Sequence, residues 1–97
     1  MGRRKRTTGE KRANEMFGAN LRALRKERDY TCAEIGHAVG IGGDAISKYE
    51  RGEREPTILL LLQFAQLFHV SLDQLITGEA GRARLLPIRR LADLIKH

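Results

Sequence analysis

The sequence predicts an all-α fold, and three observations carry that prediction. Apolar residues recur at helical spacing through most of the chain, whereas no segment shows the sustained alternation of a strand. Threonine or serine stands at two expected helix starts with glutamate or glutamine three residues later, and glycine stands where helices should end. An apolar share of 41% in 97 residues fits one domain with a modest core.

The first helix is expected over about 14–28, where apolar side chains recur on one face with polar residues between them. Residues 1–12 lack this periodicity, so the sequence predicts a flexible basic arm there, followed by a folded domain over 13–78. The apolar face of the first helix is expected to contain Met16, Phe17, Leu21 and Leu24.

Two short helices should follow. Thr31 and Glu34 have the form of a capping box, and Gly40 suits the left-handed end of the second helix. A third helix over 43–50 should bury Ile46 and Tyr49 and end at Gly52. Because only Gly40-Ile41-Gly42 separates the second helix from the third, the two must cross steeply, as in a helix-turn-helix.

Pro56 and Thr57 predict the start of a fourth helix over 58–68. Ser71 predicts the start of a brief fifth helix that ends at Thr77-Gly78. Five consecutive apolar residues, 58–62, cannot all lie on one helix face. We therefore expect some of Leu59 and Leu60 to lie outside the core. The side chains expected to point inward are Ile58, Leu61, Leu62, Ala65 and Phe68.

Residues 79–97 are expected to form a linker and an amphipathic helix, with Pro87 in its first turn. Its apolar stripe needs a partner. Either this stripe and the outer residues of the fourth helix cover each other within one chain, or they form a dimer interface. The candidate dimer surface consists of Leu59, Leu60, Ile88, Leu91, Leu94 and Ile95.

The net charge of +6 resides in the two ends of the chain. Residues 1–12 carry +5 and residues 80–97 carry +4, whereas residues 13–79 carry −3. Basic ends around an acidic body favour a polyanionic partner, either nucleic acid or an acidic membrane surface, although a basic end can also be a solubilising tail. The residues expected to bind the polyanion are Arg3, Arg4, Lys5 and Arg6.

Other function classes lack support in the sequence. The "GIGG" stretch lacks the GK[ST] ending of a phosphate loop and follows no strand, so no enzyme is expected. No cysteine–histidine spacing suggests a metal, no cofactor is expected, and the single cysteine, Cys32, fits a reducing cytosol. No apolar run approaches the roughly 20 residues of a membrane span, and no secretory signal is expected, because the basic N-terminus is not followed by an apolar segment.

Residues 17–76 resemble the Cro-like, or XRE-type, helix-turn-helix family of bacterial and phage transcription regulators. The resemblance rests on "LRALRKERDYT", "EIGHAVGI", "AISKYERGEREPT" and "LLQFAQLFHVSLDQLI". It implies a five-helix, lambda-repressor-like bundle, here with an added C-terminal helix, in which helices two and three read DNA. It also implies an ion pair between Arg25 of the first helix and Glu50 at the end of the third.

The resemblance further implies which residues contact DNA. Two positions depart from the family pattern, because Cys32 and Gly43 stand where glutamine is common, which weakens the expected phosphate and adenine contacts. Base readout is expected from Gly43, Asp44, Ala45, Ser47 and Lys48, and phosphate contacts from Thr31, Cys32, Gly42, Arg51 and Arg54.

The expected function is therefore that of a cytoplasmic, nucleoid-associated regulator that binds double-stranded DNA. A homodimeric repressor reading a near-palindromic operator is the leading form. The alternative is a protein-interaction module of antitoxin type that neutralises or recruits a partner protein. A membrane-surface protein is a weaker reading, because no amphipathic helix adjoins "RRKR".

Overall fold

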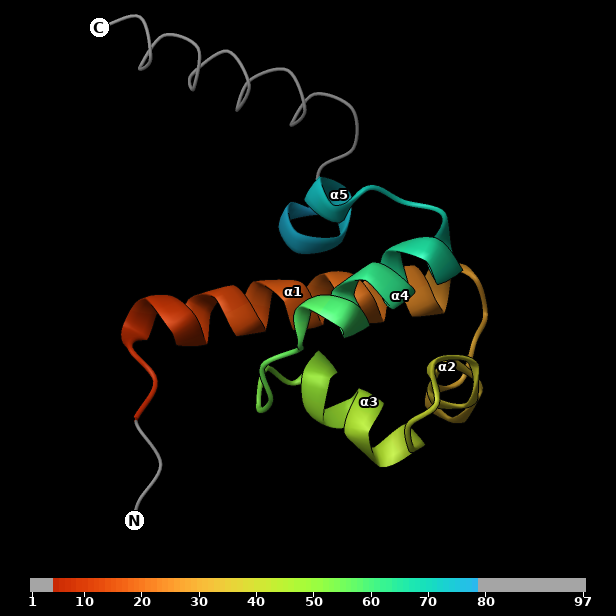
Figure 1. Cartoon of the computed structure of the whole chain (residues 1–97), viewed down its shortest axis with the longest axis horizontal. Coiled ribbons are helices and arrows are strands. Elements are labelled where there is room, and N and C mark those ends of the chain that lie inside the picture. The colour runs from red at the N-terminus through yellow and green to blue at the C-terminus, as the bar shows by residue number, and fades with distance from the viewer. Residues whose placement is uncertain (1–4, 79–97) are drawn as a thin grey trace, which may run out of the picture.

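The computed structural model describes residues 5–78, which form five helices and, within that range, no strand (Figure 1). The all-α prediction is thus confirmed. The long helix α1 lies between α5 on one side and α3 on the other, and α2 packs against both α3 and α4. The helices are α1 (Thr8–Glu27), α2 (Cys32–Val39), α3 (Gly43–Glu50), α4 (Ile58–Phe68) and α5 (Leu72–Thr77). The predicted C-terminal helix lies outside the described residues.

Helix α1 begins at Thr8, well before the expected start near residue 14. A capping box fixes this start, since the hydroxyl of Thr7 accepts from the N–H of Glu10 (3.1 Å) and the carboxylate of Glu10 accepts from the N–H of Thr7 (2.8 Å). The expectation of a flexible arm over 1–12 is therefore wrong for residues 8–12, which are helical. The capping box was present in the sequence and outweighs the missing apolar periodicity.

The core centres on Phe64 of α4, whose ring contacts α1 and α3. Its centroid lies 6.0 Å from that of Phe17 and 6.5 Å from that of Tyr49, in tilted and edge-on arrangements that aromatic pairs favour. Met16, expected on the inner face of α1, is half exposed. The buried apolar residues are Phe17, Leu21, Leu24, Ile35, Ile46, Tyr49, Leu60, Phe64, Ala65, Phe68 and Leu75.

Helix α4 is rotated relative to the sequence prediction. Ile58 and Leu62, expected to point inward, are 78% and 44% exposed, whereas Leu60, assigned to the candidate dimer surface, is buried. The inward stripe runs through Leu60 and Phe64, one helical turn apart, because the large Phe64 ring fills the centre of the core. Leu60 is thus removed from the candidate dimer surface, and Leu59, 66% exposed, remains.

The turn between α2 and α3 has the predicted form. Gly40 caps α2 in the left-handed conformation with φ 83°, which glycine adopts without steric cost. The N–H of Ile41 then donates to the carbonyl of Gly36 (2.8 Å). A Cβ on Gly36 would overlap the carbonyl oxygen of Ile41, so this close approach requires glycine. The turn therefore fixes how α3 is presented.

Candidate nucleic-acid interface

Helix α3 has one face in the core and another in solvent. Ile46 and Tyr49 are buried, whereas Asp44 and Lys48 are exposed. Residues four apart lie on the same side of a helix, so the carboxylate of Asp44 and the ammonium of Lys48 share the outer face. The surface that α3 offers to a partner therefore carries both signs of charge.

The other three predicted base-reading residues are partly buried. A Cβ on Gly43 would lie 3.1 Å from the backbone nitrogen of Ala33, so this position faces the start of α2. Ala45 packs against the core, and the hydroxyl of Ser47 donates to the sulfur of Cys32 at 3.7 Å. These residues hold α3 against α2, and the exposed side chains left for readout are Asp44 and Lys48.

The N-termini of α2 and α3 lie side by side, as the close approach of Gly43 to Ala33 shows. The positive end of a helix dipole and its unpaired N–H groups attract anions such as phosphate. Helix α2 is capped by Thr31, which exchanges hydrogen bonds with Glu34, whereas no side chain caps α3 at Gly42. The uncapped start of α3 thus lies next to the start of α2, beside the exposed face of α3.

Arg51 and Arg54 follow α3 and are exposed, but each has a contact within the described residues. Arg51 forms a two-pronged ion pair with Glu53, with Nε–Oε2 and Nη2–Oε1 distances of 2.8 and 3.2 Å. This hydrogen bonding lowers the pKa of Glu53 and raises that of Arg51. The guanidinium of Arg54 lies 5.8 Å from the ring centre of Tyr49. A phosphate would have to compete with Glu53 for Arg51.

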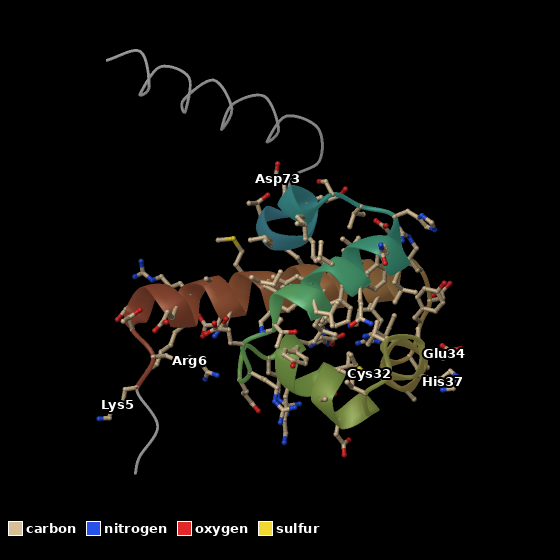
Figure 2. All side chains as sticks on the ribbon, viewed as in Figure 1. Lys5, Arg6, Cys32, Glu34, His37 and Asp73 are labelled. Atoms are coloured by element: carbon tan, nitrogen blue, oxygen red, sulfur yellow. The ribbon has the colours of Figure 1, made fainter. Side chains whose placement is uncertain are left out.

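The described part of the basic arm lies close to the turn after α3. Arg6 Nη1 donates to the carbonyl of Glu53 at 3.5 Å. Figure 2 shows Lys5 and Arg6 just before the start of α1, on the side of that helix where α3 lies. The sequence suggested an arm but not its direction, because the direction depends on where α1 begins. Arg3 and Arg4 precede the described residues.

The predicted ion pair between α1 and α3 is present. Arg25 contacts Glu50 through Nε–Oε2 and Nη2–Oε1 distances of 2.6 and 3.1 Å, and both side chains are largely buried. Hydrogen bonding to Glu50 raises the pKa of Arg25. The sulfur of Cys32 lies 4.0 Å from Glu50 Oε2, which extends this cluster to the start of α2. The cluster therefore links α2 and α3 to α1.

Across residues 5–78, no three histidine, cysteine or acidic side chains come together in a way that would bind a metal. No helix in that range combines the length and apolarity needed to cross a bilayer.

Comparison with known proteins agrees with this geometry. Residues 21–75 match the helix-turn-helix family profile, and the chain belongs to that family, which confirms the XRE-type resemblance. It is 37% identical over 66 residues to the uncharacterized HTH-type transcriptional regulator YqaE of Bacillus subtilis, covering 68% of this chain and 57% of that protein. It is 38% identical over 56 residues to the antitoxin PezA of Streptococcus pneumoniae, covering 58% of this chain and 35% of that protein.

A solved structure gives the same fold. The crystal structure of the P22 c2 repressor, in complex with a synthetic operator, superposes with a TM-score of 0.62 at 36% sequence identity. The match covers 66% of this chain and 97% of the repressor chain. The five-helix architecture is therefore that of a phage repressor domain.

Proposed function

We propose that this chain is a transcription regulator that binds double-stranded DNA with α3 in the major groove. The observation that carries the proposal is the outer face of α3, where Asp44 is exposed in the first turn, next to the start of α2, and Lys48 is exposed one turn further along. The likeness to a repressor solved in complex with an operator supports it. The family supports action by binding rather than by catalysis, on nucleoid DNA in the cytoplasm.

Lys48 and Asp44 are assigned to the base edges. The Lys48 ammonium is suited to guanine O6 and N7 or to a phosphate, whereas the Asp44 carboxylate can accept from cytosine N4. Asp44 also stabilises the start of α3 through the helix dipole. Two side chains give limited direct readout, so phosphate contacts must supply much of the affinity.

The phosphate contacts are assigned to the positions around this face. The hydroxyl of Thr31 and the backbone at Cys32 and Gly42 lie at the paired helix starts, and Arg51 and Arg54 lie beyond α3. Ala45 and Ser47 are left with a supporting role, since both are partly buried.

The proposed active form is a homodimer on a near-palindromic operator, with half-sites about one helical turn apart. The described surface that favours association is the exposed apolar edge of α4 formed by Leu59 and Leu62. The likeness to an antitoxin supports a second candidate function, in which the same edge binds a partner protein.

Selection of bound duplexes from a random pool tests the DNA proposal. The wild-type chain should enrich a motif with two related half-sites. Lys48→Ala should weaken binding of that duplex by about 1–3 kcal/mol and relax the preference at one base pair of each half-site. Arg12→Ala is the matched control, because it removes one positive charge from the side of α1 opposite the buried Phe17 and Leu21. Failure to enrich any duplex would overturn the proposal.

A further inference from the structure

The described residues form an apolar groove between α1, α4 and α5, on surfaces that the proposed DNA contact does not use. Its volume is about 300 Å³, at the small end of the range for ligand pockets. The groove is open to solvent, and Ile58 and Ile76 on its rim are 78% and 38% exposed. Its apolar lining consists of Ala13, Phe17, Pro56, Ile58, Leu61 and Ile76.

One polar side chain in the lining has an amide donor that makes no hydrogen bond within the described residues. Asn14 is 5% exposed, and no group among residues 5–78 pairs with its Nδ2. A buried amide donor without an acceptor is unfavourable, and native structures seldom leave one. The χ2 torsion of asparagine is soft, so a modest rotation can turn this amide toward an acceptor in the groove. The groove therefore suits an apolar occupant that also carries a hydrogen-bond acceptor.

We propose that this groove docks residues 86–96 of the same chain as an amphipathic helix. This segment has apolar side chains at helical spacing, namely Ile88, Leu91, Leu94 and Ile95. A helix also brings acceptors, since its last four carbonyls have no intrahelical partner. Covering Ile58 and Ile76 with this stripe removes apolar surface from water on both sides.

The position of the groove favours the chain's own segment over a second copy. Ile76 lies on the rim, only two residues before Gly78, where the described range ends. Residues 79–85 can span up to about 25 Å when extended, which is ample for a segment that starts beside its target. A short tether also gives the segment a millimolar effective concentration at the groove, which a second molecule does not have.

The charges of the two parts are complementary. Glu10 and Glu55 line the groove, whereas residues 80–97 carry a net charge of +4. Opposite potentials on the two surfaces fix the orientation of docking more than they add affinity. The proposal concerns a different face from α3, and it does not depend on whether the chain binds DNA.

Hydrogen exchange of the full chain, without DNA, tests this docking. The amides of residues 90–96, which donate hydrogen bonds within such a helix, should exchange at least about tenfold more slowly than in a free peptide of the same sequence. Leu91→Asn removes one side chain of the stripe and should abolish this protection. Asp93→Asn places the same side chain on the opposite helix face and should preserve it. Ile58→Asn tests the groove side, because a residue that is 78% exposed is not needed for the five-helix body to fold.

NMR contacts between methyl groups show whether the docked segment belongs to the same molecule as the groove or to a second copy. In a mixture of isotope-labelled and unlabelled chains, contacts between Ile76 and Leu91 should arise within one molecule and should not change on dilution. Contacts found only between molecules would overturn the proposal in favour of an exchanged dimer. Unprotected amides in the wild-type chain, or protection that survives both Leu91→Asn and Ile58→Asn, would overturn it as well.

Discussion

At the residue scale, Glu53 offsets part of the positive charge just beyond the end of α3. Its carboxylate binds both Arg51 Nε and Nη2 and leaves that guanidinium partly neutralised. Its main-chain carbonyl accepts from Arg6. One acidic residue thus contacts both a predicted phosphate ligand and the described part of the arm. Exposed pairs of this kind are weak in water, so a phosphate can displace the carboxylate.

The first prediction concerns the titration of this carboxylate. The hydrogen bond from Arg51 lowers the pKa of Glu53, so the pair persists above the ordinary glutamate pKa and is lost as the pH falls through the lowered value. Carboxyl-carbon NMR should show Glu53 titrating below an ordinary glutamate. Arg51→Ala should return it to the ordinary range, and an unchanged titration in that variant would contradict the assignment.

The second prediction concerns DNA binding by Glu53→Gln. This change removes a negative charge and the carboxylate that competes with phosphate for Arg51, so affinity should rise and the log-affinity against log-salt slope should steepen by up to about one unit. Fluorescence anisotropy over a salt series measures both quantities. Glu27→Gln is a suitable control, because Glu27 is exposed at the end of α1. Equal effects of the two variants would show that Arg51 does not contact DNA.

At the element scale, the arm and α1 act together, since the capping box at Thr7 determines where the arm leaves the helix. The third prediction is that deleting residues 2–6 flattens the same salt slope by about 3 to 4 units, because four basic side chains no longer contact phosphates. An unchanged slope would rule out the arm as a DNA ligand.

The α2–α3 turn is the second element on which the interface depends. The fourth prediction is that Gly36→Ala destabilises the fold by about 1–3 kcal/mol, because the added methyl overlaps the carbonyl of Ile41. Gly9→Ala is the matched control, since its methyl would meet nothing closer than 3.9 Å. Denaturant unfolding measures both variants. Equal stabilities would mean that the turn has room that the structure does not show.

The helices differ in how far sequence patterns predict them. The ends of α2, α3 and α5 were predictable, because capping residues and terminal glycines are local signals. The register of α4 was not, because five consecutive apolar residues give no periodicity and Phe64 selects the buried face through contacts with α1 and α3. Likewise, the inward position of Ser47 depends on Cys32 of another helix.

At the scale of the whole molecule, the Arg25–Glu50 pair joins α1 to the end of α3. The fifth prediction is that Arg25→Met or Glu50→Leu alone costs up to about 3 kcal/mol, because each leaves one charge largely buried without its partner. The double variant should recover most of that loss. Thermal unfolding of the four chains measures the coupling, and additive losses would show that the two charges do not stabilise each other.

The outer face of α3 is the surface proposed to contact DNA. Backbone amide shift mapping with the selected duplex tests it most directly, since it reports every described residue at once. We predict that the largest changes fall on residues 31–33 and 42–48 and extend to the arm, while α4 and α5 change little. Large changes confined to α4 and α5, with α3 unaffected, would contradict the account.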